Sequence, residues 1–307
     1  MADLSTTFCG IEFKNPTVLA SGVLGMTASS LKAVANSGAG GVTTKSVRLN
    51  EHKGHPNPTI ITTNAWMMNA VGLPDAGVEK AKKEISDYCK DQKVPLIVSI
   101  SGGKIDEFIK IADVVSDLPV SIIEANISCP NVESEFGRPF AYSHKDAFEV
   151  TKKIKEVLVD KKPLVIKLSP NVTDIVEIAD ACAKAGADGF CLINTLGPGL
   201  AINLETRIPI LANKVGGISG PAIKPLAVKI VHDVYKATKL PIIGTGGVKS
   251  GEDALEMIMA GAILTGIGAG VYYRGINVFK HVANEINEWC DKNEVKTVRE
   301  LVGTVKI

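Results

Sequence analysis

Eight short apolar segments alternate with helical segments along nearly the whole chain, and this alternation is the feature that most constrains the fold. The apolar segments are rich in β-branched residues and are mostly apolar on both faces, which is typical of strands in a covered parallel sheet. We predict strands at Thr17–Ala20, Gly41–Thr44, Leu96–Ile100, Ser121–Ala125, Leu164–Leu168, Gly189–Ile193, Ile242–Gly244 and Ala262–Gly266. We predict helices at Ser29–Ser37, Val78–Lys90, Ile105–Val115, Lys145–Leu158, Asp174–Ala185, Ala222–Ala237 and Glu252–Ala260, with Asn277–Lys292 after the last strand. Eight strand–helix units in succession predict an α/β fold of the (β/α)8 TIM-barrel type.

The chain has 307 residues, more than the roughly 250 residues of a bare barrel of this type. We expect one domain over residues 1–307, with the surplus in an N-terminal hairpin and in long loops. The hairpin, Thr6–Phe13, turns at Gly10 and is placed to close the bottom of the barrel. The long loops follow strands 2, 4 and 6, at Lys45–Gly77, Asn126–His144 and Asn194–Gly220. Long loops in compact domains usually carry function, so the active site is expected at the carboxyl ends of the strands.

The balance of charge excludes several classes of partner. The net charge is +1 and no long basic run occurs, so neither nucleic acid nor an anionic membrane surface is expected to bind. The sequence has no basic segment followed by an apolar one at its start, and no run approaches the ~18 apolar residues of a membrane-spanning helix. A soluble, cytoplasmic protein is the prediction.

Cysteine and histidine positions speak against a metal site in this chain. The six cysteines are scattered singly, without the close pairs that zinc or iron–sulfur sites use. The five other than Cys129 are interpreted as small apolar filler. None of the five histidines falls at a predicted strand end, which argues against a metal site or a Ser/His/Asp triad and places them on the surface or on helices: His52, His55, His144, His232 and His281.

The residues at or just after the strand ends form a set that packing alone would not select. In chain order they are Ser21-Gly22, Lys45-Ser46, Ser101-Gly102, Asn126 to Cys129, Lys167 with Ser169, Asn194-Thr195, Thr245-Gly246-Gly247 and Gly268-Ala269-Gly270. Lys45 and Lys167 point into one barrel mouth and repel each other unless an anion lies between them. We therefore predict an anionic ligand or cofactor.

Three glycine-containing segments predict where a phosphate would bind. Two of them, Thr245–Val248 and Gly266–Gly270, follow strands 7 and 8, where barrels of this type hold phosphates on backbone amides. The third, Ser219-Gly220-Pro221, precedes a helix and offers a serine, a glycine and a proline suited to the first helical position. The lysines have rival roles: a Schiff base, a phosphate partner, or a cation that balances a reduced flavin. The side-chain amides of the asparagine residues at the strand ends favour a planar ligand that bears amide groups over a sugar phosphate.

The stretch Asn126-Ile127-Ser128-Cys129-Pro130-Asn131 places a thiol at the end of strand 4. Pro130 fixes its own φ and favours an extended Cys129, which stiffens the segment. Local sequence alone leaves two interpretations balanced, a buried structural cysteine or a reactive thiol. Its position among two lysines and several amides favours the reactive thiol.

Taken together, these motifs resemble those of class 1 dihydroorotate dehydrogenases. The resemblance covers Phe13 to about Thr304, and it rests on Asn126–Asn131, Lys45-Ser46, Asn69–Leu73, Lys167–Asn171, Asn194-Thr195, Gly217–Ala222 and Gly246-Gly247. Within the class the chain looks most like the type B catalytic subunit, because of Lys167–Ile175, Ile193–Leu196 and Gly216–Pro225. The resemblance implies oxidation of dihydroorotate to orotate in de novo pyrimidine biosynthesis. It also implies a homodimer that joins an electron-transfer subunit, carrying FAD and a 2Fe-2S cluster, in a heterotetramer that reduces NAD.

The resemblance also implies roles for individual residues. Cys129 takes the position of the base that removes the C5 proton, while FMN accepts the hydride from C6. The implied FMN contacts are Ser21, Lys45, Ser46, Ser99, Asn126, Lys167, Ile193, Gly220, Gly246, Gly247, Gly268 and Ala269. The implied substrate contacts are Lys45, Asn69, Ala70, Val71, Gly72, Leu73, Asn126, Asn194 and Thr195.

The sequence departs from the family pattern at two places, and two alternative functions are considered beside this hypothesis. Ala269 stands where the family often has threonine, and the loop Val132–Phe140 is more charged and aromatic than the family pattern. One rival is a type A enzyme, a homodimer that reduces fumarate without a partner subunit. The other is a flavin-free barrel lyase that uses Lys45 or Lys167 as a Schiff base. Class 2 enzymes resemble the chain less, since they use a serine base and an N-terminal extension.

Overall fold

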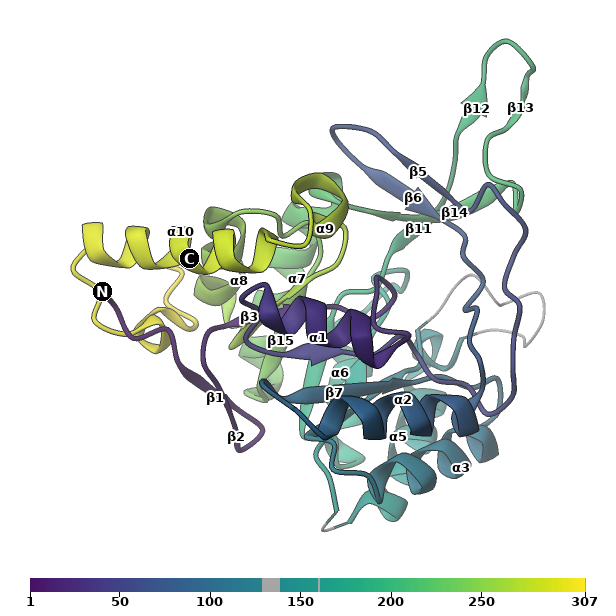
Figure 1. Cartoon of the computed structure of the whole chain (residues 1–307), viewed down its shortest axis with the longest axis horizontal. Coiled ribbons are helices and arrows are strands. Elements are labelled where there is room, and N and C mark those ends of the chain that lie inside the picture. Colours follow the sequence, from purple (N-terminus) through teal and green to yellow (C-terminus); the bar gives the residue numbers. More distant parts are fainter. Residues whose placement is uncertain (129–138, 160, 307) are drawn as a thin grey trace.

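All eight predicted strands form one parallel sheet that closes into a barrel (Figure 1). The structure is a computed structural model that describes residues 1–128, 139–159 and 161–306. The barrel strands are β3 (Thr17–Leu19), β4 (Val42–Thr43), β7 (Leu96–Ile100), β8 (Ile122–Asn126), β9 (Leu164–Lys167), β10 (Gly189–Leu192), β15 (Ile242–Thr245) and β16 (Leu264–Ile267). Their order is β3-β16-β15-β10-β9-β8-β7-β4, and a parallel bridge between Val18 and Gly41 joins the first strand to the last. The predicted fold class is confirmed.

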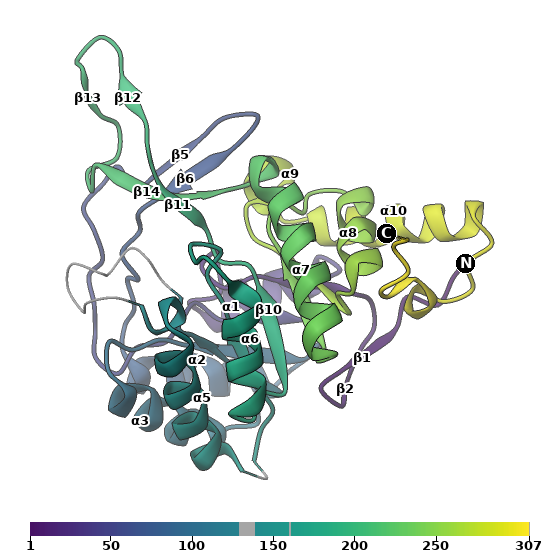
Figure 2. The same ribbon diagram turned by 180° about the vertical axis from the view of Figure 1, so that it is seen from behind.

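The predicted helices are present and pack around the barrel (Figures 1 and 2). They are α1 (Ala28–Asn36), α2 (Val78–Cys89), α3 (Ile105–Ser116), α5 (His144–Leu158), α6 (Ile175–Lys184), α7 (Lys224–Thr238), α8 (Gly251–Ala260) and α10 (Val278–Lys292), with a short α9 (Gly270–Arg274) that the sequence did not predict. Short 3-10 turns lie at η2 (Phe140–Tyr142), η3 (Pro221–Ile223) and η4 (Val298–Leu301). Outward-facing strand residues such as Ile123 and Ile166 join the helices in the main hydrophobic core. Among the described residues, no helix combines the length and apolar character needed to span a membrane.

The N-terminal hairpin closes the bottom of the barrel, as predicted. Strands β1 (Thr6–Phe8) and β2 (Ile11–Phe13) pair in antiparallel register. Phe8 and Phe13 pack edge to face, with ring centroids 6.4 Å apart, and both are buried against inward-facing barrel residues such as Ile97 and Val165. The hairpin and the lower inward side chains therefore form an apolar plug, so a ligand can enter the barrel only from the opposite end.

Two of the three predicted long loops contain β-structure that the sequence did not predict. The loops after the second and sixth barrel strands contribute β5 (Ile60–Thr62), β6 (Met67–Asn69), β11 (Leu196–Leu200) and β14 (Val215–Ser219) to an antiparallel sheet of order β11-β14-β6-β5. Strands β11 and β14 have the sequences LGPGL and VGGIS, in which glycine and proline hide the strand pattern. Most of the loop after the fourth strand, residues 129–138, lies outside the described part of the chain.

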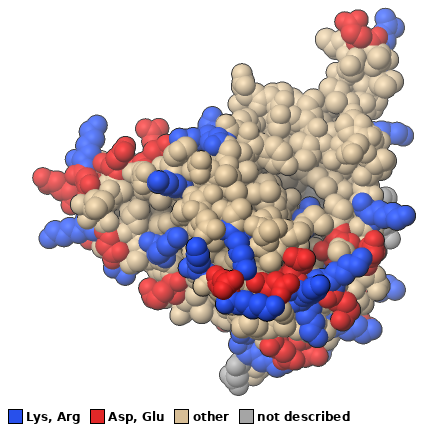
Figure 3. All heavy atoms as spheres, viewed as in Figure 1, with Lys and Arg blue, Asp and Glu red and all other residues tan. Residues whose placement is uncertain are grey.

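A hairpin arm extends from this second sheet. It consists of β12 (Ile202–Asn203) and β13 (Ile208–Pro209), and Figures 1 and 2 show it projecting away from the barrel. Its apolar residues are strongly exposed, at 51% for Ile202, 85% for Leu204 and 58% for Ile208. Figure 3 shows that charged side chains gather over the helices in the lower half of that face and that few lie between them and the tip of the arm.

Candidate active site

A pocket opens at the carboxyl ends of the barrel strands, between the barrel and the second sheet. The space inside it, counting the open mouth, is about 1050 Å³, which is large enough for a cofactor-sized ligand. Most of the predicted site residues line it: Ser21, Lys45, Ser46, Asn126, Lys167, Ile193, Gly220, Gly246, Gly247, Gly268 and Ala269, together with Asn69, Val71, Gly72, Leu73, Asn194 and Thr195. Ser99 and Ala70 are fully buried and lie outside this lining.

Two lysines extend into the pocket and are largely shielded from water. Lys45 as a residue is 8% exposed and Lys167 is 5% exposed. Lys45 Nζ donates to the carbonyl oxygen of Gly22 at 3.4 Å, and Lys167 Nζ donates to Ser21 Oγ at 3.0 Å. Both ammonium groups therefore converge on the turn after β3. Two ammonium groups close together in a partly buried pocket create a positive potential, and this arrangement favours the predicted anionic ligand.

A network of amides and hydroxyls forms the adjoining wall, and Asn126 is at its centre. Asn126 Nδ2 donates to Ser46 Oγ at 3.3 Å, while Asn126 Oδ1 accepts from Ser128 Oγ at 3.1 Å and from Asn194 Nδ2 at 3.3 Å. Ser99 supports this wall from behind, since its Oγ lies 3.0 Å from Ser46 Oγ. The network fixes the orientation of groups that can both donate and accept hydrogen bonds, which suits a planar ligand with amide groups.

At the opposite end, the pocket wall is made of backbone. Gly247 has φ of +81°, and a Cβ added there would lie 2.7 Å from Lys224 Cβ and 2.9 Å from the carbonyl oxygen of Gly220. Only glycine combines this conformation with so close a contact. The segments after β14 and β15 therefore meet through their main chains, and they form the kind of surface on which backbone groups can reach a phosphate.

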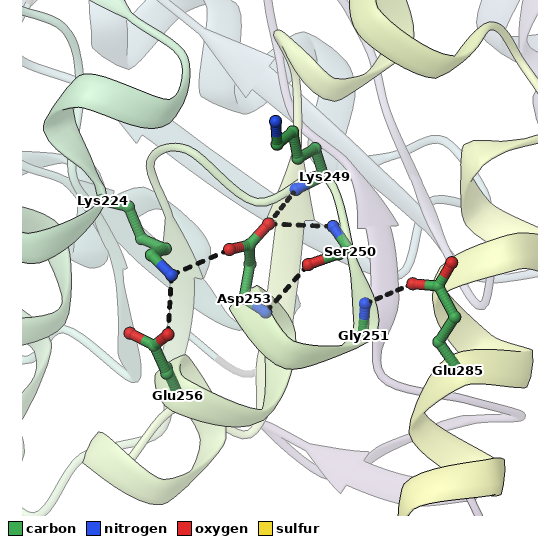
Figure 4. Close-up of polar contacts among 7 residues, drawn as sticks. All are labelled: Lys224, Lys249, Ser250, Gly251, Asp253, Glu256 and Glu285. Carbon is green, nitrogen blue, oxygen red and sulfur yellow. Dashed lines mark hydrogen bonds and ion pairs between the residues drawn. The ribbon is translucent and has the colours of Figure 1, made fainter. Parts of the chain in front are cut away.

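Two charged networks hold this backbone surface in place, and Figure 4 shows the first of them together with the Gly251–Glu285 hydrogen bond of the second. In the first, Lys224 Nζ contacts Asp253 Oδ1 at 2.9 Å and Glu256 Oε1 at 2.6 Å. Asp253 also accepts from the backbone N–H groups of Lys249 at 3.1 Å and Ser250 at 2.9 Å. Burial raises the pKa of Asp253, but its hydrogen bonds to Lys224 and to these N–H groups outweigh burial and lower that pKa below its usual value. The carboxylate thus stays charged and caps α8.

The second network joins α9 to α10 and to the start of α8. Glu285 accepts from the backbone N–H of Gly251 at 2.6 Å (Figure 4) and from Arg274 Nη2 at 2.7 Å. Arg274 Nη1 also donates to the carbonyl oxygen of Lys249 at 2.9 Å. Arg274 therefore ties α9, which follows the Gly268-Ala269 segment, to the turn that follows Gly247.

Comparison with known proteins identifies the family. A model of the dihydroorotate dehydrogenase family matches residues 3–290. The chain belongs to the dihydroorotate dehydrogenase family. It is 47% identical over 303 residues to a protein of Methanocaldococcus jannaschii named dihydroorotate dehydrogenase B (NAD(+)), catalytic subunit, with 98% of this chain and 97% of the relative covered.

Relatives in other organisms carry the same name. The Pyrococcus horikoshii protein is 41% identical, with 98% of this chain and 97% of the relative covered. The Geobacter metallireducens protein is 40% identical, with 99% of each chain covered. The family resemblance predicted from the motifs is confirmed, and the chain is an oxidoreductase of the dihydroorotate dehydrogenase family.

Cys129, the predicted base of this dihydroorotate dehydrogenase, lies outside the described residues, so its predicted role stays a prediction. Ser128, directly before it, is fully buried and belongs to the Asn126 network. The other five cysteines fit their interpretation as filler: burial raises the pKa of all five thiols, and it raises those of Cys182 and Cys191 to about 12. Such thiols are inert at neutral pH.

Several pocket residues were missed by the sequence argument. Ile60, Met67, Ile223 and Tyr272 line the pocket from β5, β6, η3 and α9. Ile60, Met67 and Tyr272 lie on elements that were not predicted, and Ile223 lies at the start of a predicted helix. All four are apolar or aromatic, so no signal in the sequence distinguished them from core residues. His55 was predicted on the surface or on a helix, and it keeps partial exposure. It is half-buried in the loop after β4, where its Nδ1 lies 3.2 Å from the carbonyl oxygen of Ala70, beneath the Asn69–Leu73 segment.

Proposed function

We propose that this chain oxidises dihydroorotate to orotate in de novo pyrimidine biosynthesis, with FMN in the barrel pocket and NAD as the final electron acceptor. The observation that carries the proposal is the convergence of two buried lysines and the Asn126–Asn194 network in a single pocket. The names of the relatives support the substrate and the acceptor.

The residues of the pocket suit FMN. Backbone at Gly220, Gly246, Gly247, Gly268 and Ala269 offers a place for the phosphate, without needing the threonine hydroxyl that Ala269 lacks. Ser21, Lys45, Ser46, Lys167 and Ile193 would hold the ring system, with Ser99 acting through Ser46. When bound, FMN supplies the acceptor for the hydride that leaves C6 of the substrate.

The chain's own residues would then bind and orient the substrate. Asn69, Val71 to Leu73, Asn126, Asn194 and Thr195 offer amide and backbone groups of fixed orientation to the carbonyl and N–H groups of dihydroorotate. Lys45 supplies positive charge for the substrate carboxylate. Lys167 stabilises the negative charge that develops during reduction. Cys129 removes the proton from C5, helped by this electropositive surrounding.

We further propose that the chain works as a homodimer and joins an electron-transfer subunit, which carries FAD and a 2Fe-2S cluster, in a cytoplasmic heterotetramer. The relatives are named as catalytic subunits, which supports a separate partner. The exposed apolar arm at β12–β13 supports self-association. If the chain is instead a type A enzyme, it will form a lone dimer that uses fumarate.

Expression of the chain with its native gene neighbours, followed by purification and absorbance spectroscopy, tests the proposal. FMN, FAD and iron–sulfur absorbance in one complex that reduces NAD with dihydroorotate is the expected result. A flavin-containing lone dimer that transfers electrons to fumarate contradicts the type B assignment. Absence of flavin, with substrate trapped on Lys45 or Lys167 by borohydride, contradicts the whole proposal and supports the lyase.

The role of Cys129 has its own test. We expect Cys129→Ala to bind FMN normally but to lose most of its rate of flavin reduction by dihydroorotate at neutral pH, because proton transfer to a positioned base contributes roughly 10²–10⁴-fold. Stopped-flow absorbance measures this rate, and Cys191→Ala is the matched control, since that thiol is buried outside the pocket lining. Full retention of the rate in Cys129→Ala refutes the assignment.

A further inference from the structure

The inner face of β8 carries a carboxylate to which the proposed reaction gives no role. Side chains on this strand alternate, so that Ile122 belongs to the apolar plug, Glu124 is the next inward residue, and Asn126 lines the pocket. Glu124 is only 2% exposed, and its Oε1 has no hydrogen-bond partner among the residues that the structure describes. A charge buried in this way is costly unless an opposite charge compensates it.

Lys167 on the neighbouring strand is placed to supply that charge. The register of β8 and β9 aligns Glu124 with Val165 and Asn126 with Lys167. Since Val165 belongs to the plug and Lys167 lines the pocket, Glu124 lies one inward-facing position below the level of Lys167. The thiol of Cys191 responds to both groups: burial is the main cause that raises its pKa to about 12, the charge of Glu124 and a hydrogen bond with Glu124 also raise it, and Lys167 lowers it. The two charges thus act on the same point inside the barrel.

We propose that Glu124 is a positioning residue of the cofactor pocket, whose carboxylate balances the ammonium group of Lys167 and limits the positive charge that the pocket presents to its ligand. The part of this inference that concerns FMN rests on the proposed function. A reduced flavin carries more negative charge than an oxidised one, so the net charge beneath the pocket sets how readily the bound cofactor is reduced. Glu124 keeps the reduction potential of the cofactor lower than it would be without this negative charge.

The first test needs no cofactor. A double-mutant cycle in the apoprotein compares Glu124→Gln, Lys167→Gln and the double variant by urea denaturation. If the two charges balance each other, removing either one takes a nearby opposite charge away from the other, which stays buried. We therefore expect the folding equilibrium constant of the double variant to be at least fivefold larger than the value obtained by adding the free-energy changes of the two single variants. An additive cycle overturns the proposal.

A folding failure is also informative in this design. If Glu124→Gln is insoluble, a soluble double variant supports charge balance. Insolubility of the double variant, when Lys167→Gln alone is soluble, contradicts charge balance and assigns Glu124 a packing role instead.

The second test measures the midpoint potential of bound FMN by spectroelectrochemistry. We expect Glu124→Gln to shift the reduction equilibrium at least tenfold towards the reduced form, which corresponds to about 30 mV for a two-electron couple. Glu124→Asp keeps the charge and is expected to restore most of the wild-type potential, while Val165→Ala is the control for a neutral change at the same level of the barrel. A wild-type potential in Glu124→Gln overturns the inference. Failure of the wild-type chain to bind FMN refutes the proposed function, and the cycle in the apoprotein still decides whether the charges balance.

Discussion

Gly247 shows how one residue determines the shape of the predicted phosphate end of the pocket. Its φ of +81° and the space beside it, 2.7 Å from Lys224 Cβ and 2.9 Å from the Gly220 carbonyl oxygen, leave no room for a side chain. The residue thereby brings the turn after β15 against the segment before η3. The motif predicts Gly247 as a cofactor contact, but nothing in the sequence indicates which backbone segment this glycine meets.

We expect Gly247→Ala to weaken FMN binding by at least tenfold and to lower the free energy of unfolding by about 1–3 kcal/mol, through backbone strain and displacement of Gly220. Fluorescence titration with FMN and urea denaturation measure the two effects. Gly275→Ala is the matched control, because Gly275 also has positive φ, +69°, but nothing lies within 4 Å of its added Cβ. The control should lose stability without losing FMN affinity, and equal FMN affinity in both variants contradicts the prediction.

At the scale of elements, the short helix α9 depends on its neighbours for its place beside the pocket. Arg274 at its end donates to the Lys249 carbonyl oxygen and to Glu285, and Glu285 in turn accepts from the Gly251 N–H. The helix begins directly after Ala269 and also carries Tyr272, which lines the pocket. A change at Arg274 should therefore reach the pocket without touching the ligand.

We expect Arg274→Ala to reduce FMN affinity severalfold while costing only about 1 kcal/mol of stability, since the ion pair is partly exposed to solvent. Isothermal titration with FMN and thermal unfolding measure the two quantities. Arg299→Ala is a suitable control: Arg299 pairs with Asp3 at 2.8 Å, with about half of its side chain exposed, and neither residue lines the pocket. If both variants bind FMN like the wild type, α9 does not depend on Arg274.

The elements also show which parts of the structure the sequence could predict. The barrel strands were predicted because buried strands such as Leu96–Ile100 are short, mostly apolar runs between clear helix patterns. The antiparallel sheet was missed because β11 and β14 contain glycine and proline, so their pairing depends on neighbours rather than on local preference. Within the site, Lys45 and Asn126 could be predicted because packing alone would not select polar residues at the ends of buried strands. Met67 and Tyr272 could not be predicted, because they are apolar or aromatic and lie on elements that were not predicted.

At the scale of the whole molecule, the exposure of apolar residues on the β12–β13 arm is not explained by the packing of a single chain. A two-stranded hairpin is marginally stable by itself in water, yet β12–β13 projects from the second sheet with Ile202, Leu204 and Ile208 each more than half exposed. Exposed apolar groups that lie together usually mark an interaction surface. A second copy of the chain, bringing its own arm, would bury these residues symmetrically.

We expect Leu204→Asp to convert the proposed homodimer to monomers, because a carboxylate would then be buried without a partner in the interface. Sedimentation velocity at several protein concentrations measures the change, and the proposed dimer of the wild-type chain is the reference. Leu226→Asp controls for the added charge, since Leu226 is 37% exposed on α7 rather than on the arm. Because the pocket lies under the same sheet from which the arm projects, we also expect monomeric Leu204→Asp to bind FMN more weakly. A Leu204→Asp chain that sediments as the wild type does would show that the arm is not the dimer contact.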